Sequence, residues 1–216
     1  MNGFRQTAMA ATVALLVVTS GCIGFLAGDK PLSVESTEAS VSSSTLEDAG
    51  YEHNRTTTVT VERTFEAAGQ SRDVVATNYL TEYEKSVDLG AMGGERKAAV
   101  FVAFTTPKVE VLGKTFNPVG DMSNRELLGQ LQSRYDSIEV GQQSGSDTVS
   151  VLGTEATVER FDGQARIGGT SVDIYVHVTK IEHGDDYVIA VGVYPQRLDG
   201  ERENVLRLVS GLQHEG

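Results

Sequence analysis

The sequence predicts an α+β fold, in which an antiparallel β-sheet is partly covered by two main helices. Two segments, 57–65 and 172–180, alternate apolar and polar residues as strands do. Two others, 123–135 and 201–212, carry an apolar stripe at helical spacing. The loop IEHGDD joins 172–180 directly to the strand predicted at 187–194, and so short a connection favours antiparallel pairing.

The predicted strands are spread over the chain after residue 56. The run AAVFVAF within 95–106 is apolar on both faces, which predicts a central strand. The dipeptides Asp162-Gly163 and Asp199-Gly200 are interpreted as turns. The remaining predicted strands are 72–85, 138–142, 148–152, 155–166 and a short one beginning at Val109.

Both predicted helices have clear sequence signals. Ser123 followed by Glu126 forms a capping box, in which each side chain satisfies the other residue's free backbone N–H. Leu127, Leu128, Leu131 and Tyr135 continue this segment as one apolar stripe. The last helix buries a similar set, which comprises Val205, Leu206, Leu208, Val209 and Leu212.

The charge balance is strongly acidic, with a formal net charge of −12 and only six lysines among the 18 basic residues. A hydrated acidic coat with few lysines keeps a protein soluble in concentrated salt, which predicts a salt-loving source. No basic cluster is present, so nucleic acid is excluded as a partner.

Residues 1–21 are typical of a secretory signal peptide, with Arg5, an apolar run at 8–18 and then small residues. The chain's single cysteine, Cys22, follows directly. This pattern predicts cleavage between Gly21 and Cys22 and attachment of a diacylglycerol lipid to Cys22. The alternative is an uncleaved membrane span, because 8–27 is uncharged and just long enough to cross a bilayer. Both interpretations place the remaining chain outside the cell, because Arg5 stays inside.

Residues 22–45 are rich in Ser and Thr and show no apolar period, which predicts a disordered, lipid-anchored tether. A single extracytoplasmic domain is then expected over 46–216. Asn54, Arg55 and Thr56 form a sequon that makes Asn54 a candidate for N-glycosylation.

The run TSGC at Cys22, the Ser/Thr-rich stalk, the segment TVTVER and the ending DDYVIAVGVYPQRLDGERENVLRLVSGL together resemble a haloarchaeal cell-surface lipoprotein family of unknown function. The ending also resembles the PsbP and Mog1 group, which implies a sandwich closed by a strand, a turn and a helix. Neither resemblance supplies catalytic residues.

No catalytic site, metal site or cofactor is predicted, because the sequence contains no Walker loop, HExxH, GxSxG, CxxC or GxGxxG motif. The densest group of ionisable residues is interpreted as a solvated acidic turn with an exposed histidine, and a weak surface cation site is the alternative. Its members are His177, Glu182, His183, Asp185 and Asp186.

Two other features have a structural and a functional interpretation. The glycine-rich run LGAMGG at 89–94 is interpreted as a hairpin connection, with a mobile loop over a groove as the alternative. Five tyrosines fall on predicted strands. They are interpreted as core or half-buried positions of the sheet, and the alternative is an aromatic face that binds sugar or peptide. They are Tyr79, Tyr83, Tyr175, Tyr187 and Tyr194.

These observations predict a lipoprotein held on the extracellular face of the cell membrane by lipid at Cys22, with a non-catalytic binding or envelope-supporting role. Its partner would be an envelope protein or a small ligand. One alternative is a lipid-anchored hydrolase, for which His177 is the candidate base. The other is a small solute-binding lipoprotein, although such proteins usually have two lobes and more residues than this domain offers.

Overall fold

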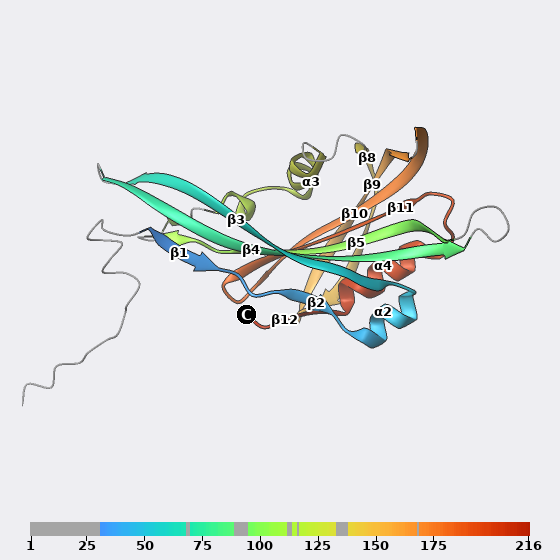
Figure 1. The fold of residues 1–216 in the computed structure, drawn as a ribbon, viewed down its shortest axis with the longest axis horizontal. Helices are drawn as coiled ribbons and strands as arrows, with labels where there is room; N and C mark the ends of the chain where they lie inside the picture. The colour runs from blue at the N-terminus through green and yellow to red at the C-terminus, as the bar shows by residue number, and fades with distance from the viewer. Residues whose placement is uncertain are drawn as a thin grey trace, which may run out of the picture.

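The computed structural model describes residues 31–67, 70–88, 95–111, 114–115, 117–132, 138–167 and 169–216 (Figure 1). The predicted signal peptide, Gly21, Cys22 and the 89–94 loop therefore lie outside the described residues. Within the ranges described, no helix combines the length and the apolar character that a membrane crossing needs.

The centre of the fold is an eight-stranded sheet with the order β1-β4-β5-β11-β10-β9-β8, and β3 pairs with β4. The short β1 runs parallel to β4, and every other pairing in this sheet is antiparallel. The strands are β1 (Leu32–Glu35), β3 (Glu52–Ala67), β4 (Gln70–Asp88), β5 (Glu95–Pro107), β8 (Ile138–Val151), β9 (Thr154–Ile167), β10 (Thr170–His183) and β11 (Asp186–Pro195). β5 contains the run that is apolar on both faces, and it lies between β4 and β11. The prediction of a central strand is therefore confirmed.

The predicted α+β class is wrong, because the structure is predominantly β and sandwich-like, with 65% strand, 18% helix and a mixed sheet. The strands extend far beyond their apolar segments, since backbone hydrogen bonds continue where the side chains are polar. For example, β8 runs unbroken through the stretch between the predicted strands 138–142 and 148–152, and its register shifts there. The described residues also contain three α-helices rather than two, which are α2 (Ser43–Ala49), α3 (Asn124–Gln132) and α4 (Glu201–Ser210).

The two faces of the sheet carry separate cores (Figure 1). On one face, α2 and α4 lie side by side with β2 (Ala39–Val41) and β12 (Leu212–His214), which pair with each other. On the other face, α3 and the 3-10 turn η2 (Pro118–Gly120) cover the β8–β11 end. Phe101 and Leu208 are fully buried in the first core, and Phe161 and Val178 are buried in the second.

The predicted tether is not borne out over its second half, because residues 31–45 are part of the folded domain. β1 extends the sheet along β4, and β2 docks through a hydrogen bond from the Val41 N–H to the Tyr83 hydroxyl at 2.9 Å. Ala39 and Val41 are buried, and α2 packs against α4. These elements are three to seven residues long, too short to show an apolar period.

Several local predictions are confirmed. The Ser123 N–H donates to Glu126 Oε2 at 2.8 Å and the Glu126 N–H donates to Ser123 Oγ at 3.3 Å, which is the capping box. The β10–β11 loop turns at Gly184, which has a φ of 56°. The strand expected after Val109 is β6 (Glu110–Val111), which pairs with β7 (Lys114–Thr115).

Candidate functional site

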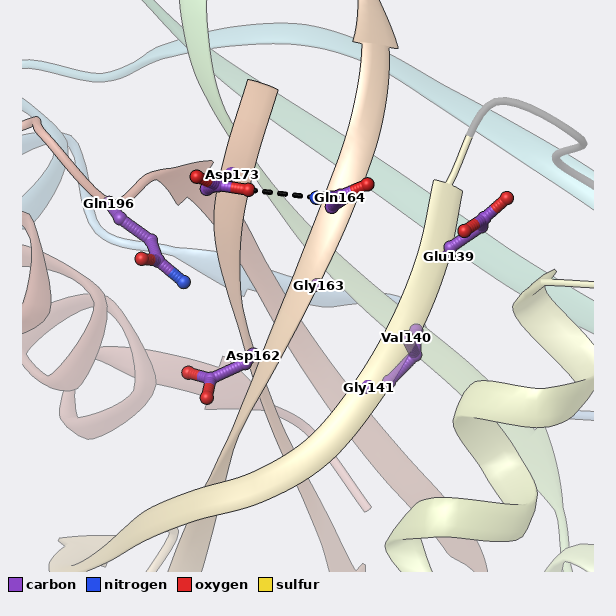
Figure 2. Close-up of a pocket in the computed structure, with 8 residues that line it drawn as sticks. All are labelled: Glu139, Val140, Gly141, Asp162, Gly163, Gln164, Asp173 and Gln196. Atoms are coloured by element: carbon purple, nitrogen blue, oxygen red, sulfur yellow. Dashed lines mark hydrogen bonds between the residues drawn. The ribbon is translucent and has the colours of Figure 1, made fainter. Parts of the chain in front are cut away.

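A surface hollow of about 430 Å³ lies at one end of the sheet, over β8, β9 and β10 (Figure 2). Five polar side chains line it, and three of them are carboxylates: Glu139, Asp162, Gln164, Asp173 and Gln196. Four of the five come from three adjacent strands, and Gln196 comes from the segment after β11. The hollow is therefore built mainly by paired strands rather than by a loop.

Strand register brings these side chains together. Gln164 of β9 is directly opposite both Glu139 of β8 and Asp173 of β10, so the three form one cross-strand row. The amide nitrogen of Gln164 donates to Asp173 Oδ1 at 3.0 Å (Figure 2). The Gln196 N–H donates to the Asp173 carbonyl at 3.0 Å, which holds the last part of the lining against the row.

Gly163 forms the floor of the hollow, and its interpretation as a turn residue is wrong. Asp162 and Gly163 lie inside β9, where Gly163 pairs with Val140 and with Ile174. A Cβ atom at Gly163 would lie 2.7 Å from the Glu139 carbonyl oxygen, so a side chain cannot fit. A glycine inside a strand marks such a close approach, and here it lets the backbones of β8 and β9 come close together beside the hollow.

The side chains of the hollow offer more hydrogen-bond acceptors than donors. Glu139, Asp162 and Asp173 are exposed, and none forms an ion pair within the described ranges. Both amide nitrogens already donate to the protein, that of Gln164 to Asp173 and that of Gln196 to the Ile174 carbonyl at 3.2 Å. Such a site suits a positively charged ligand with several N–H donors.

His177 lies on the same face as the hollow, but it is not the exposed histidine that the sequence suggested. It is 1% exposed, its ring stacks on Tyr194, and its Nε2 atom is 2.9 Å from the Tyr194 hydroxyl. Burial, and then the positive charge of Arg160, lowers its pKa from 6.5 to about 4. His177 is therefore neutral at pH 7, and no serine, cysteine or carboxylate among the described residues is bonded to it.

The tyrosines lie on strands as predicted, and most have structural surroundings. Tyr83, Tyr187 and Tyr194 are buried, and the Tyr79 hydroxyl donates to Glu35. Tyr175 is half-buried, opposite Asp162 of the hollow, but the Arg160 guanidinium lies 4.8 Å from the centre of its ring. These contacts favour sheet positions over an open aromatic face.

The ionisable group around the β10–β11 loop does not form a metal site in the part of the chain that the structure describes. His177 lies apart from it, and the exposed Glu182 pairs with Lys108 at 3.2 Å. His183 and Asp186 instead meet His214 of β12, a residue that sequence reasoning left out. In β12, Leu212 and His214 are buried and Gln213 between them is exposed. The strand-like spacing of Leu212 and His214 is the sequence signal that could have indicated a buried His214.

Asn54 lies on β3, where it is exposed, and its amide donates to Glu82 Oε1 at 2.9 Å. Its glycosylation stays a prediction, as does lipid attachment at Cys22.

One comparison with known proteins finds a match. A search of the curated proteins finds none, and a family model described as DUF6517, a domain of unknown function, matches residues 38–213. This range begins just before β2, so it includes only the last part, 38–45, of the segment that the sequence assigned to the tether. The resemblances to a haloarchaeal lipoprotein family and to the PsbP and Mog1 group stay predictions. Because the match covers most of its length, the chain belongs to the DUF6517 family.

Proposed function

We propose that this chain is a non-catalytic binding protein, held on the outer face of the cell membrane by lipid at Cys22, and that the hollow over β8–β10 takes its ligand. The observation that carries the proposal is the set of three exposed carboxylates around a concavity in which each lining amide already donates one hydrogen bond to the protein. The ligand class that fits is a molecule with several ammonium or guanidinium groups.

A spread of carboxylates favours such a ligand over a single metal ion. Asp162, Asp173 and Glu139 come from different strands and point in different directions (Figure 2). One ion needs its ligands to converge on one point, whereas an extended polyamine or a basic peptide can reach separate carboxylates.

A binding role also agrees with the surroundings of His177. A hydrolase would need a base within hydrogen-bond reach of a nucleophile. His177 is buried, has a lowered pKa and is bonded to a tyrosine that is itself 3% exposed. The hydrolase alternative therefore loses its candidate base.

Titration calorimetry with spermidine tests the ligand class. We expect wild-type protein to bind spermidine, and Asp162→Asn combined with Asp173→Asn to weaken binding by about tenfold or more, because each lost charge contact is worth roughly 1 kcal/mol. Binding should also weaken as sodium chloride is raised. Glu155→Gln, which removes an exposed carboxylate at the other end of β9, is the matched control and should bind as wild type does. Absence of spermidine binding, or equal binding by the double variant, would contradict the proposal.

Intact-mass measurement of membrane-extracted protein tests the anchor separately. We expect a mature chain that begins at Cys22 and carries an added lipid mass, because the sulfur of Cys22 is the predicted acceptor. Cys22→Ser should leave the signal peptide in place or release the protein from the membrane. A wild-type chain that still begins at Met1 or Asn2 would rule out the lipid anchor and favour the uncleaved span.

A further inference from the structure

We propose that Asp186, His214 and His183 form a proton-linked clasp, which fastens the end segments of the fold to the β10–β11 hairpin and opens when both imidazoles are protonated. The clasp lies at the start of β11, away from the hollow over β8–β10, and it does not depend on the ligand proposed there.

The clasp joins three parts of the chain that are far apart in sequence. Asp186 Oδ2 accepts a hydrogen bond from the Thr37 N–H at 2.8 Å and lies 3.0 Å from His214 Nε2. The Nδ1 atom of His214 lies 2.9 Å from Nδ1 of His183. The side chain of His214 is fully buried and that of Asp186 is 5% exposed, so the contact between these two groups is shielded from water. His183 is half-buried, and its contact with His214 is only partly shielded.

The geometry fits a hydrogen bond between the two imidazoles rather than a shared metal ion. The ring centres of His183 and His214 are 5.2 Å apart. This is close to the sum of the 2.9 Å distance between the two Nδ1 atoms and the distance from each Nδ1 atom to the centre of its own ring. The two Nδ1 atoms therefore face each other almost along a straight line, as in an N–H···N bond. A metal ion would instead need both lone pairs to converge on a third point, about 2.0–2.1 Å from each nitrogen.

The partners decide where the protons lie. A carboxylate only accepts, so His214 Nε2 carries a proton that it donates to Asp186. In neutral His214 the Nδ1 atom is then an acceptor, and His183 Nδ1 must be the donor.

Counting protons shows how the clasp would open. With Asp186 ionised and both imidazoles neutral, the three groups together carry one negative charge. One added proton brings this to zero, and every hydrogen bond survives, because only one of the two facing Nδ1 atoms needs to carry hydrogen. With a second proton both Nδ1 atoms carry hydrogen, so the bond between them is lost and two positive charges face each other at 2.9 Å.

Other charged side chains belong to the segments that meet at the clasp, and most of them are acidic. Lys108 is the one cation of this set, and it is already bonded to the Gly184 carbonyl and to Glu182. The acidic members are Glu35, Glu38, Glu182, Asp185 and Glu215. The second proton has to break the bond between the imidazoles whatever the charge of these neighbours.

Opening would release the segments at both ends of the domain. Thr37 lies between β1 and β2, and His214 is the last residue of β12, which pairs with β2 through His214 and Ala39. The amides of β2 and β12 should therefore lose protection together, while the central β5 stays closed.

Hydrogen exchange of the full chain, followed by mass spectrometry and corrected for the chemical exchange rate, tests this clasp. We expect peptides that cover 36–41 and 211–216 to lose protection by about tenfold or more between about pH 7.5 and about pH 5, because the hydrogen bond between the two imidazoles is broken. Peptides from β5 should keep their protection. Unchanged protection of both end segments in wild-type protein would overturn the proposal.

His183→Gln is the informative variant, because an amide can donate to or accept from His214 but cannot take the second proton. We expect its end segments to stay protected at about pH 5. His53→Gln, which removes an exposed histidine on β3, is the matched control and should open as wild type does. If His183→Gln opens as far as wild-type protein, another group controls the opening and the clasp is wrong.

Discussion

His177 illustrates how burial decides the chemistry of a single residue. Its neighbours on β10 alternate between two cores, and the odd-numbered positions face α4, so the imidazole is enclosed when the helix packs. Desolvation is the largest cause of its lowered pKa, and the nearby Arg160 adds to it. The sequence showed that His177 lies on a strand, but it could not show that the helix covers that face.

This lowered pKa makes the folded state sensitive to acid. Between pH 6.5 and about 4 the unfolded chain binds a proton at His177 and the folded chain does not, so stability falls as pH falls through that window. By about pH 4.5 the loss amounts to about 2–3 kcal/mol. We expect urea unfolding to show His177→Gln losing less stability than wild type between about pH 7 and about pH 4.5, by about 2 kcal/mol.

Wild-type protein and His53→Gln should lose the same amount of stability, because His53 is exposed. An equal acid loss in His177→Gln and wild type would show that His177 is not held neutral.

At the scale of single elements, the sequence predicts best where the signal is local. The capping box at Ser123 and Glu126 needs only residues three apart, and it correctly marks the start of α3. Likewise, the two-sided apolar run of β5 needs only its own residues to indicate a central strand. These predictions succeed because the interactions that decide them lie within one element.

Elements that depend on distant partners could not be predicted in the same way. β1 and β2 exist because β4, Tyr83 and β12 offer them hydrogen bonds, and nothing in the run LSVESTEASV announces those partners. The hollow is another such case, since Asp162 and Asp173 become neighbours of Glu139 only through strand register. A polar stretch read alone therefore does not distinguish a disordered tether from a strand that pairs with a distant part of the chain.

For the whole molecule, residues 31–49 are part of the structure that closes one face of the sheet. Lys85 of β4 donates to the Ala49 carbonyl at 3.0 Å and forms an ion pair with Glu201 of α4 at 2.9 Å. Glu201 is 1% exposed, so this pair depends on the elements around it to exclude water. α2, β4 and α4 are thus joined at one buried charge pair.

Truncation tests that dependence. Deleting residues 1–30 should leave the urea midpoint unchanged, whereas deleting 1–45 removes β1, β2 and the start of α2, and with them the buried side chains of Ala39 and Val41. We expect the longer deletion to lose at least about 3 kcal/mol, or to abolish cooperative unfolding followed by circular dichroism, because the lost apolar burial leaves a gap over the sheet. The two deletions differ only by residues 31–45, the part of the predicted tether that the structure shows folded. Equal midpoints for both would mean that this half contributes nothing to stability, as a disordered tether requires.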